Sequence, residues 1–160
     1  MSHEFPSRVV WTGDRGIGTA HYRAYDRTWD VAMPGRPVVH CSNDPALGGD
    51  PLKPNPEDLL ISALSACHML WYLHFAADAG IVVRSYVDEP IGFGEVSAGG
   101  AGRFTSAVLR PRITVMTGTD LARAAALHHR IDEVCFIARS VNFPVACEPV
   151  FVVEGDATSA

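Results

Sequence analysis

Features that would point to several common functions are scarce in this sequence of 160 residues or missing from it. Lys53 is the only lysine, no run of basic residues occurs, and the formal net charge is −5, which argues against nucleic acid or an anionic membrane as a partner. Residues 1–8 lack the apolar core of a secretion signal, so we expect a cytoplasmic protein. No CxxC motif occurs, and cysteines in a reducing compartment serve more often as reactive thiols, metal ligands or inert side chains than as structural disulfides.

Long apolar stretches are also rare. The one that approaches the length of a membrane span runs from Leu59 to Ala77, and its polar side chains disfavour a membrane-spanning role. These side chains are Ser62, Ser65, His68 and His74. No internal repeat is visible, and a chain of this length is typical of a single domain, here residues 1–160, that buries a core without disulfides.

The strand signals come in groups. The expected strands are 8–11, 18–33, 38–41, 81–87, 104–116 (one bent strand or a pair) and 149–154, with the glycine-rich residues 88–103 as a hairpin edge or a mobile loop. Helix signals cover residues 55–80 and 121–139. Because strands and helices do not alternate strictly in the order β-β-β-α-β-β-α-β, the sequence predicts an α+β fold.

The first expected helix has clear signals at both ends. Asn55 is a preferred N-cap, Pro56 suits the first helical position, and Glu57 and Asp58 complement the positive end of the helix dipole. Gly80 is the residue expected just after the last turn, which gives a helix of about 24 residues. Because this helix is apolar nearly all round, we expect a partner subunit to cover part of it in a homodimer.

Two cysteines lie on apolar stripes of the two expected helices. A projection at 100° per residue gives the stripes Leu60, Ala63, Leu64, Cys67, Leu70, Trp71 and His74, and Leu121, Ala124, His128, Ile131, Cys135 and Ala138. If the stripes face each other, Cys67 and Cys135 can form a disulfide, which needs Cα atoms within about 7 Å. On these residues alone, paired redox chemistry and inert packing both remain open.

A metal site is a rival interpretation of the same stripes. Cys67, His74, His128 and Cys135 make a Cys₂His₂ set. However, spacings of seven residues separate each pair by ~10 Å along its helix, whereas zinc ligands converge to about 2.0–2.3 Å from the ion. We therefore expect no metal site from this set.

A buried thiol reacts only if a nearby positive charge stabilises its thiolate. Arginine can do this because it stays charged, and an acid can orient the arginine through paired hydrogen bonds. Glu57 is either such an acid or simply a partner of the helix dipole. It lies ~15 Å before Cys67 along the helix, so it can serve only the cysteine of another chain or act through a reaching arginine. Cys41 and Cys147, near expected strands and loops, are expected to be inert.

Two sequence motifs resemble a known family. Residues 55–60 (Asn-Pro-Glu-Asp-Leu-Leu), followed by residues 65–69 (Ser-Ala-Cys-His-Met), resemble the OsmC/Ohr family, the osmotically inducible and organic hydroperoxide resistance proteins. The second match is residues 135–140 (Cys-Phe-Ile-Ala-Arg-Ser), where the better-known branches carry Cys-Pro-x-Ser. The chain is therefore similar to a less characterised OsmC-like branch, and the resemblance covers nearly all of it.

The resemblance implies an intertwined α+β homodimer around two long central helices, with two active sites at the subunit interface. It implies a thiol peroxidase in which Cys67 attacks an organic hydroperoxide and Cys135 resolves the product as a disulfide. A dithiol reductant, of the lipoyl type or a small thiol, restores both cysteines, and no tightly bound cofactor is implied. Glu57 matches the family glutamate.

The activating arginine is harder to place. Residues 12–15 (Thr-Gly-Asp-Arg) resemble the Thr-Gly-Gly-Arg turn of the hydroperoxide-resistance branch, which makes Arg15 the first choice. Arg23, Arg27 and Arg36 are the alternatives. Two rival interpretations keep the fold: a dimer that binds a small ligand or a metal without peroxidase turnover, and one whose thiols no longer act.

Overall fold

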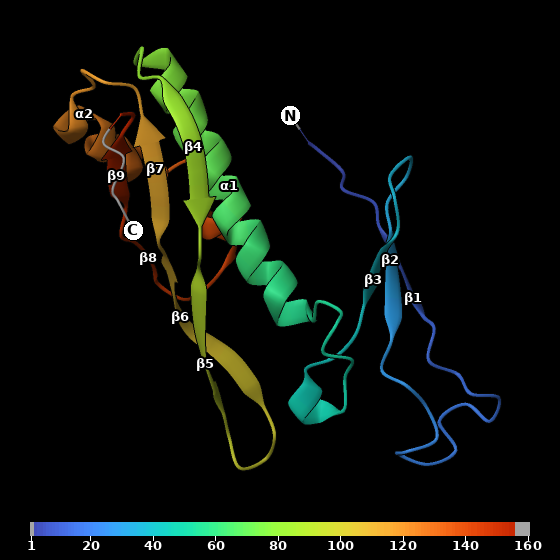
Figure 1. The fold of residues 1–160 in the computed structure, drawn as a ribbon. Helices are drawn as coiled ribbons and strands as arrows, with labels where there is room; N and C mark the ends of the chain where they lie inside the picture. Colours follow the sequence, from blue (N-terminus) through green and yellow to red (C-terminus); the bar gives the residue numbers. More distant parts are fainter. Residues whose placement is uncertain (1, 156–160) are drawn as a thin grey trace. The chain divides into compact units, whose positions relative to one another are not determined.

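The computed structural model describes residues 2–155, which form a mixed α+β structure in two compact units (Figure 1). One unit ends at Leu60 and the other begins at Ile61. The expected α+β class is confirmed, although the strands are more numerous and the second helix is shorter than the sequence predicts.

The first unit contains a small antiparallel sheet. Its strands, in spatial order, are β1 (Arg8–Trp11), β2 (Trp29–Ala32) and β3 (Val39–Cys41). A short 3₁₀ helix (Pro45–Leu47) follows, and the Asp44 carboxylate caps it by accepting a hydrogen bond from the N–H of Ala46.

The expected strand over residues 18–33 is wrong for all but Trp29–Ala32. The aromatic and basic residues before β2 form a loop that is stabilised by contacts between their side chains. The Arg27 guanidinium lies 4.4 Å from the ring centroid of Tyr22 and 5.0 Å from that of Tyr25, and it donates hydrogen bonds to the carbonyl oxygens of both residues. The alternation of aromatic and basic residues therefore reflects cation–π contacts within a loop rather than the two faces of a strand.

Helix α1 (Pro56–Asp78) begins and ends as expected. The Asn55 side-chain oxygen accepts from the N–H of Asp58 at 2.8 Å, and the Asp58 carboxylate accepts from the N–H of Asn55 at 3.0 Å, a reciprocal capping box. Gly80 adopts φ 71°, a left-handed conformation that glycine accepts without strain, and the chain turns there.

The buried face of α1 differs from the expected stripe. Its buried residues are Ile61, Leu64, His68, Tyr72, Phe75 and Ala76. Leu70, a member of the expected stripe, is 62% exposed. The stripe is predicted wrongly because a helix that is apolar nearly all round has no clear hydrophobic periodicity to show which side faces the core. By length and composition α1 could also cross a membrane, a property that it shares with core helices of other proteins.

The second unit contains two mixed three-stranded sheets. One has the order β4 (Val83–Asp88), β7 (Pro111–Val115) and β9 (Val150–Val153). The other has the order β5 (Ile91–Val96), β6 (Gly102–Leu109) and β8 (Val145–Cys147). In each sheet the first pair is antiparallel and the second is parallel. The glycine-rich residues thus contribute to a hairpin, and β8 is a strand that the sequence pattern does not predict.

One side chain links the strands to α1 near the end of β4. Asp88 accepts a hydrogen bond through one carboxylate oxygen from the N–H of Arg110, between β6 and β7, at 2.7 Å. Its other carboxylate oxygen accepts from the Ser65 hydroxyl of α1 at 2.5 Å. Asp88 therefore fixes the middle of α1 against the point where the strands change sheets.

The expectation of one long helix over residues 121–139 is wrong. Helix α2 covers only Leu121–Ala126, and 3₁₀ helices follow at Leu127–Arg130 and Ala138–Ser140. Residues 134–137 include β-branched and aromatic side chains, which have a lower helix propensity than alanine or leucine. Because 3₁₀ and α turns have similar periods, four expected positions still share a buried face. These are Ala124, His128, Ile131 and Cys135.

Candidate active site and a buried histidine–cysteine cluster

Cys67 and Cys135 are in contact within the second unit. Cys67 is half-buried on α1, whereas Cys135 is fully buried in the segment after α2. Both pack in the same apolar cluster, the Cys67 thiol acts on the ionisation of Cys135, and both are free thiols. The structure therefore brings together the two cysteines that lie on the two expected apolar stripes.

The surroundings of Cys135 favour its neutral thiol. Burial, and then the interaction with the neighbouring Cys67 thiol, raise the pKa of Cys135 to about 11. The N–H of Ala138, which donates to the Cys135 sulfur at 3.4 Å, offsets part of this rise. Cys135 is thus poorly suited to be the first nucleophile, and the more accessible Cys67 is the better candidate.

We expect iodoacetamide to modify Cys67 of the reduced protein well before Cys135. A thiol with a pKa of about 11 is only about 0.1% thiolate at pH 8, and alkylation requires the thiolate. Because the pKa is raised, the rate at Cys135 should increase about ten-fold per pH unit until the pH approaches about 11. Peptide mass spectrometry after timed quenching measures both rates, and urea-unfolded protein is the control. Faster modification of Cys135 would contradict the assignment of Cys67 as the first nucleophile.

The candidate arginine and acid belong to the first unit. Arg15 is about half exposed, donates to the carbonyl oxygens of Ala24 (3.1 Å) and Arg23, and lies 3.7 Å from the Asp26 carboxylate. These contacts order the turn that carries Arg15. Glu57 is exposed in the first turn of α1, and its side chain makes no hydrogen bond or ion pair within the described residues 2–155.

The alternative arginines differ in their contacts. Arg27 is held by the two tyrosines of its loop. The guanidinium of Arg36 lies 3.7 Å from the sulfur of Met33, and Arg23 is exposed. Of the four candidates, Arg15 is the one paired with a carboxylate among the described residues.

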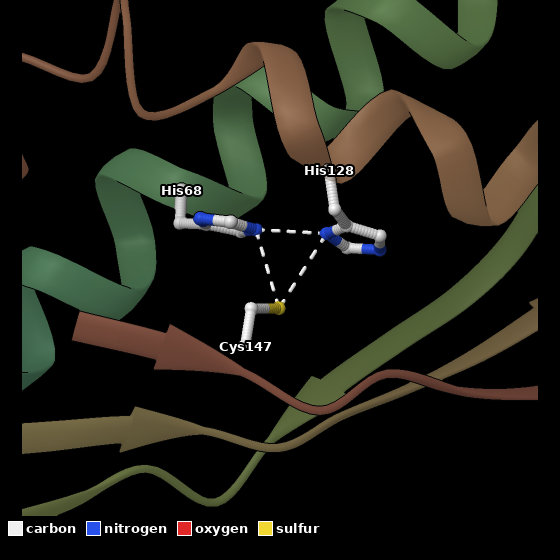
Figure 2. Close-up of side chains that lie close together, drawn as sticks. All are labelled: His68, His128 and Cys147. Atoms are coloured by element: carbon white, nitrogen blue, oxygen red, sulfur yellow. Dashed lines mark hydrogen bonds between the residues drawn. The ribbon is translucent and has the colours of Figure 1, made fainter.

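A second cluster lies one residue further along α1. Nε2 of His68 lies 2.8 Å from Nδ1 of His128, and Sγ of Cys147 lies 3.5 Å from each of these nitrogens (Figure 2). His68 comes from α1, His128 from the 3₁₀ helix after α2, and Cys147 from the end of β8. We call these three residues the His–His–Cys cluster.

The Cys₂His₂ set considered from the sequence is not assembled. His128 belongs to the His–His–Cys cluster, while His74 is exposed and packs against the rings of Trp71 and Phe75. The seven-residue spacing leaves Cys67 and His74 apart on one helix, in line with the distance argument made from the sequence.

Aromatic rings hold the His–His–Cys cluster in place. The Tyr72 ring stacks on that of His128 with centroids 4.3 Å apart, and the Phe151 ring lies 6.2 Å away. His68 and His128 are 4% and 7% exposed. Nε2 of His128 and the hydroxyl of Tyr86 are buried without a hydrogen-bond partner in the described part of the chain.

Burial keeps the cluster uncharged near neutral pH. It lowers the pKa of His68, lowers the pKa of His128 to about 4, and raises the pKa of Cys147 to about 12. Asp88 and Asp132 contribute to the rise at Cys147 and partly offset the fall at His68. The cluster therefore consists of three neutral donor groups in a locally negative field.

The sequence matches the model of one protein family. The model of the family described as OsmC-like protein matches residues 48–149. The chain belongs to the OsmC-like family. The matched range includes Glu57, the paired cysteines and the whole His–His–Cys cluster. Among curated protein sequences, none matches this one.

Solved structures share the OsmC-like fold over nearly the whole chain. An OsmC-like protein of unknown function from Vibrio cholerae O1 biovar eltor is 29% identical, with a TM-score of 0.83 over 93% of this chain and 100% of that chain. An organic hydroperoxide resistance protein from Legionella pneumophila is 18% identical, with a TM-score of 0.67 over 94% and 98% of the two chains. Another, from Elizabethkingia anophelis, is 15% identical, with a TM-score of 0.66 over 96% and 98%. At such identities the last two establish the fold.

The sequence of this OsmC-like chain indicates neither His68 nor Cys147 as a functional residue. His68 stands out as a polar residue within an apolar run and as part of the motif at residues 65–69, without a role of its own, and Cys147 only as a cysteine in a short apolar segment. Their meeting depends on β8, which pairs with β6 in parallel across many residues of chain. Local hydrophobic patterns contain no information on such long-range pairing.

Proposed function

We propose that this OsmC-like protein is a thiol-dependent peroxidase that reduces organic hydroperoxides. The contact between the half-buried Cys67 and the buried Cys135 carries this proposal. Two structural relatives are described as organic hydroperoxide resistance proteins, which supports the substrate class. The apolar surroundings of both cysteines favour an alkyl group over a small polar peroxide.

The proposed reaction has three balanced steps. The Cys67 thiolate attacks one peroxide oxygen, the O–O bond breaks, and the alcohol leaves with a proton while Cys67 becomes a sulfenic acid. The Cys135 sulfur then attacks the Cys67 sulfur, water leaves, and a disulfide forms. A dithiol reduces this disulfide by exchange, which returns both cysteines to thiols and leaves the reductant oxidised. No tightly bound cofactor takes part.

Activation of Cys67 requires a positive charge and therefore a second group. We assign this role to Arg15, with Glu57 as the acid that orients it in a homodimer. The exposed carboxylate of Glu57 supports this assignment because it is free to pair with an arginine. The exposure of Leu70 on an otherwise apolar helix supports the dimer, because a partner subunit would cover such a side chain. We place the protein in the cytoplasm, where dithiol reductants are present.

One equivalent of cumene hydroperoxide should convert the reduced protein to a form with a Cys67–Cys135 disulfide. The two side chains are already in contact, so the second step needs little rearrangement. Peptide mapping without reduction identifies the bridge, and thiol titration should show the loss of two thiols per chain with Cys41 and Cys147 still free. In a Cys135→Ser control we expect a Cys67 sulfenic acid that dimedone traps. A bridge to Cys41 or Cys147, with Cys135 free, would refute the resolving role.

A further inference from the structure

The His–His–Cys cluster takes no part in the proposed peroxidase reaction. The geometry points to a metal-binding role: Nε2 of His68, Nδ1 of His128 and Sγ of Cys147 bind one divalent ion of the zinc class, with a fourth position open to solvent (Figure 2). Two imidazoles and one thiolate form a donor set that suits zinc, and catalytic zinc sites commonly combine three protein ligands with a water.

The distances between the donor atoms support this assignment. A tetrahedral zinc ion holds nitrogen and sulfur ligands about 3.5 Å apart and two nitrogen ligands about 3.3 Å apart. Both nitrogen–sulfur separations in the cluster are 3.5 Å. The nitrogen–nitrogen separation is 2.8 Å, which is a hydrogen bond between the imidazoles. Metal binding replaces that hydrogen bond, with the two nitrogens moving apart by about half an ångström.

The charges around the cluster also favour a cation. Asp88, Asp132 and Glu148 place negative charge around Cys147, where a positive counter-charge would be stabilised. A bound divalent ion supplies that counter-charge, and the Cys147 proton leaves to solvent as the metal–sulfur bond forms. The negative field of these carboxylates therefore attracts a metal ion to the cluster.

A cavity provides access and the open position. It has a volume of about 260 Å³, and Asp132 and His129 line it together with the three members of the cluster. This volume exceeds the roughly 10–15 Å³ that a cavity needs to hold one water molecule, so a water or a small anion can complete the coordination. The rings of Tyr72 and Phe151 restrain His128, which pre-orients its Nδ1 for the ion.

The test uses the full-length protein, freed of metal with a chelator, reduced with a phosphine and titrated with Co²⁺. We expect one Co²⁺ per chain, with sulfur-to-cobalt charge-transfer absorption in the near ultraviolet that Zn²⁺ abolishes by displacement. Cys147→Ser should lose this absorption and bind Zn²⁺ at least about 100-fold more weakly, because even loss of an indirect ligand contact costs 10–100-fold. Circular dichroism establishes that the variant is folded, and His68→Gln provides a second variant that removes a nitrogen ligand.

Matched controls separate this site from the peroxidase cysteines. A Cys67→Ser/Cys135→Ser double variant and His74→Asn on the exposed side of α1 should both keep the absorption and the Zn²⁺ affinity. The proposal is overturned if wild-type protein binds no Co²⁺, or binds it without charge-transfer absorption. It is also overturned if the absorption persists in Cys147→Ser and disappears in the double variant, because the sulfur donor is then the Cys67–Cys135 pair.

Discussion

Replacing Cys67 by serine should lower the rate of organic hydroperoxide reduction by at least about 1,000-fold, or about 4 kcal/mol in the activation free energy. A serine hydroxyl has almost the same shape as the thiol but does not ionise near neutral pH, so it cannot attack the peroxide oxygen without a dedicated base. Stopped-flow measurement with cumene hydroperoxide and a dithiol gives the rate. Because Cys67 is half-buried on a helix, its replacement should leave the fold intact.

The pattern across variants makes this prediction specific. Cys135→Ser should retain one rapid turnover and then accumulate the sulfenic acid, because attack on the peroxide does not need the resolving thiol. Cys41→Ser makes the same thiol-to-hydroxyl change at a fully buried position of the first unit and should leave the rate unchanged. If Cys67→Ser kept most of the activity, the rival in which the fold is retained without this thiol chemistry would be favoured.

Exchange of subunits between two inactive variants should restore activity. Glu57→Gln keeps the shape of the side chain and removes the charge, so we expect a rate at least about ten-fold lower because the arginine is no longer oriented toward the thiolate and the leaving alkoxide. Its melting temperature should stay within a few degrees of the wild type, since a charge at a helix start contributes only about 0.3–1 kcal/mol. This difference between rate and stability separates a positioning role from a merely structural one.

The exchange experiment tests whether the site is shared. Glu57 lies ~15 Å from Cys67 along α1, so its own chain offers no direct contact. In a heterodimer of Glu57→Gln and Cys67→Ser chains, one of the two sites then has both wild-type groups, and random mixing should recover about a quarter of the wild-type activity. Verified heterodimers without activity would show that each chain uses its own glutamate or none. A monomer in sedimentation at micromolar concentration would refute the dimer itself.

The ends of α1 are predictable from the sequence because capping is local chemistry. The hydrogen bonds between Asn55 and Asp58 and the turn at Gly80 involve residues that are neighbours in the chain. The direction that α1 turns toward the core is not predictable, because nearly every face is apolar. The expected stripe therefore includes Leu70, which is exposed, and omits His68, which is buried.

For residues 121–139 the burial is better predicted than the secondary structure. The secondary structure of this segment is predicted wrongly, yet four of the six expected stripe positions are buried, because α and 3₁₀ turns repeat at similar intervals. Leu121 is exposed, and Leu127, which lies outside the stripe, is buried. The meeting of Cys67 with Cys135 follows from those positions. The meeting of His128 with Cys147 does not, because it requires a parallel strand that short-range periodicity cannot reveal.

Cys67 and His68 are adjacent on α1, and their partners Cys135 and His128 belong to one continuous stretch of chain. Adjacent helical positions point about 100° apart. The stretch therefore contacts α1 through two side chains that point in different directions, Cys67 and His68. If one end of this stretch separated from α1 while the other end stayed in contact, the packing between the two ends would be lost. Residues 128–135 should therefore open and close as one cooperative unit in the native state, with their amide protons exchanging together rather than one by one.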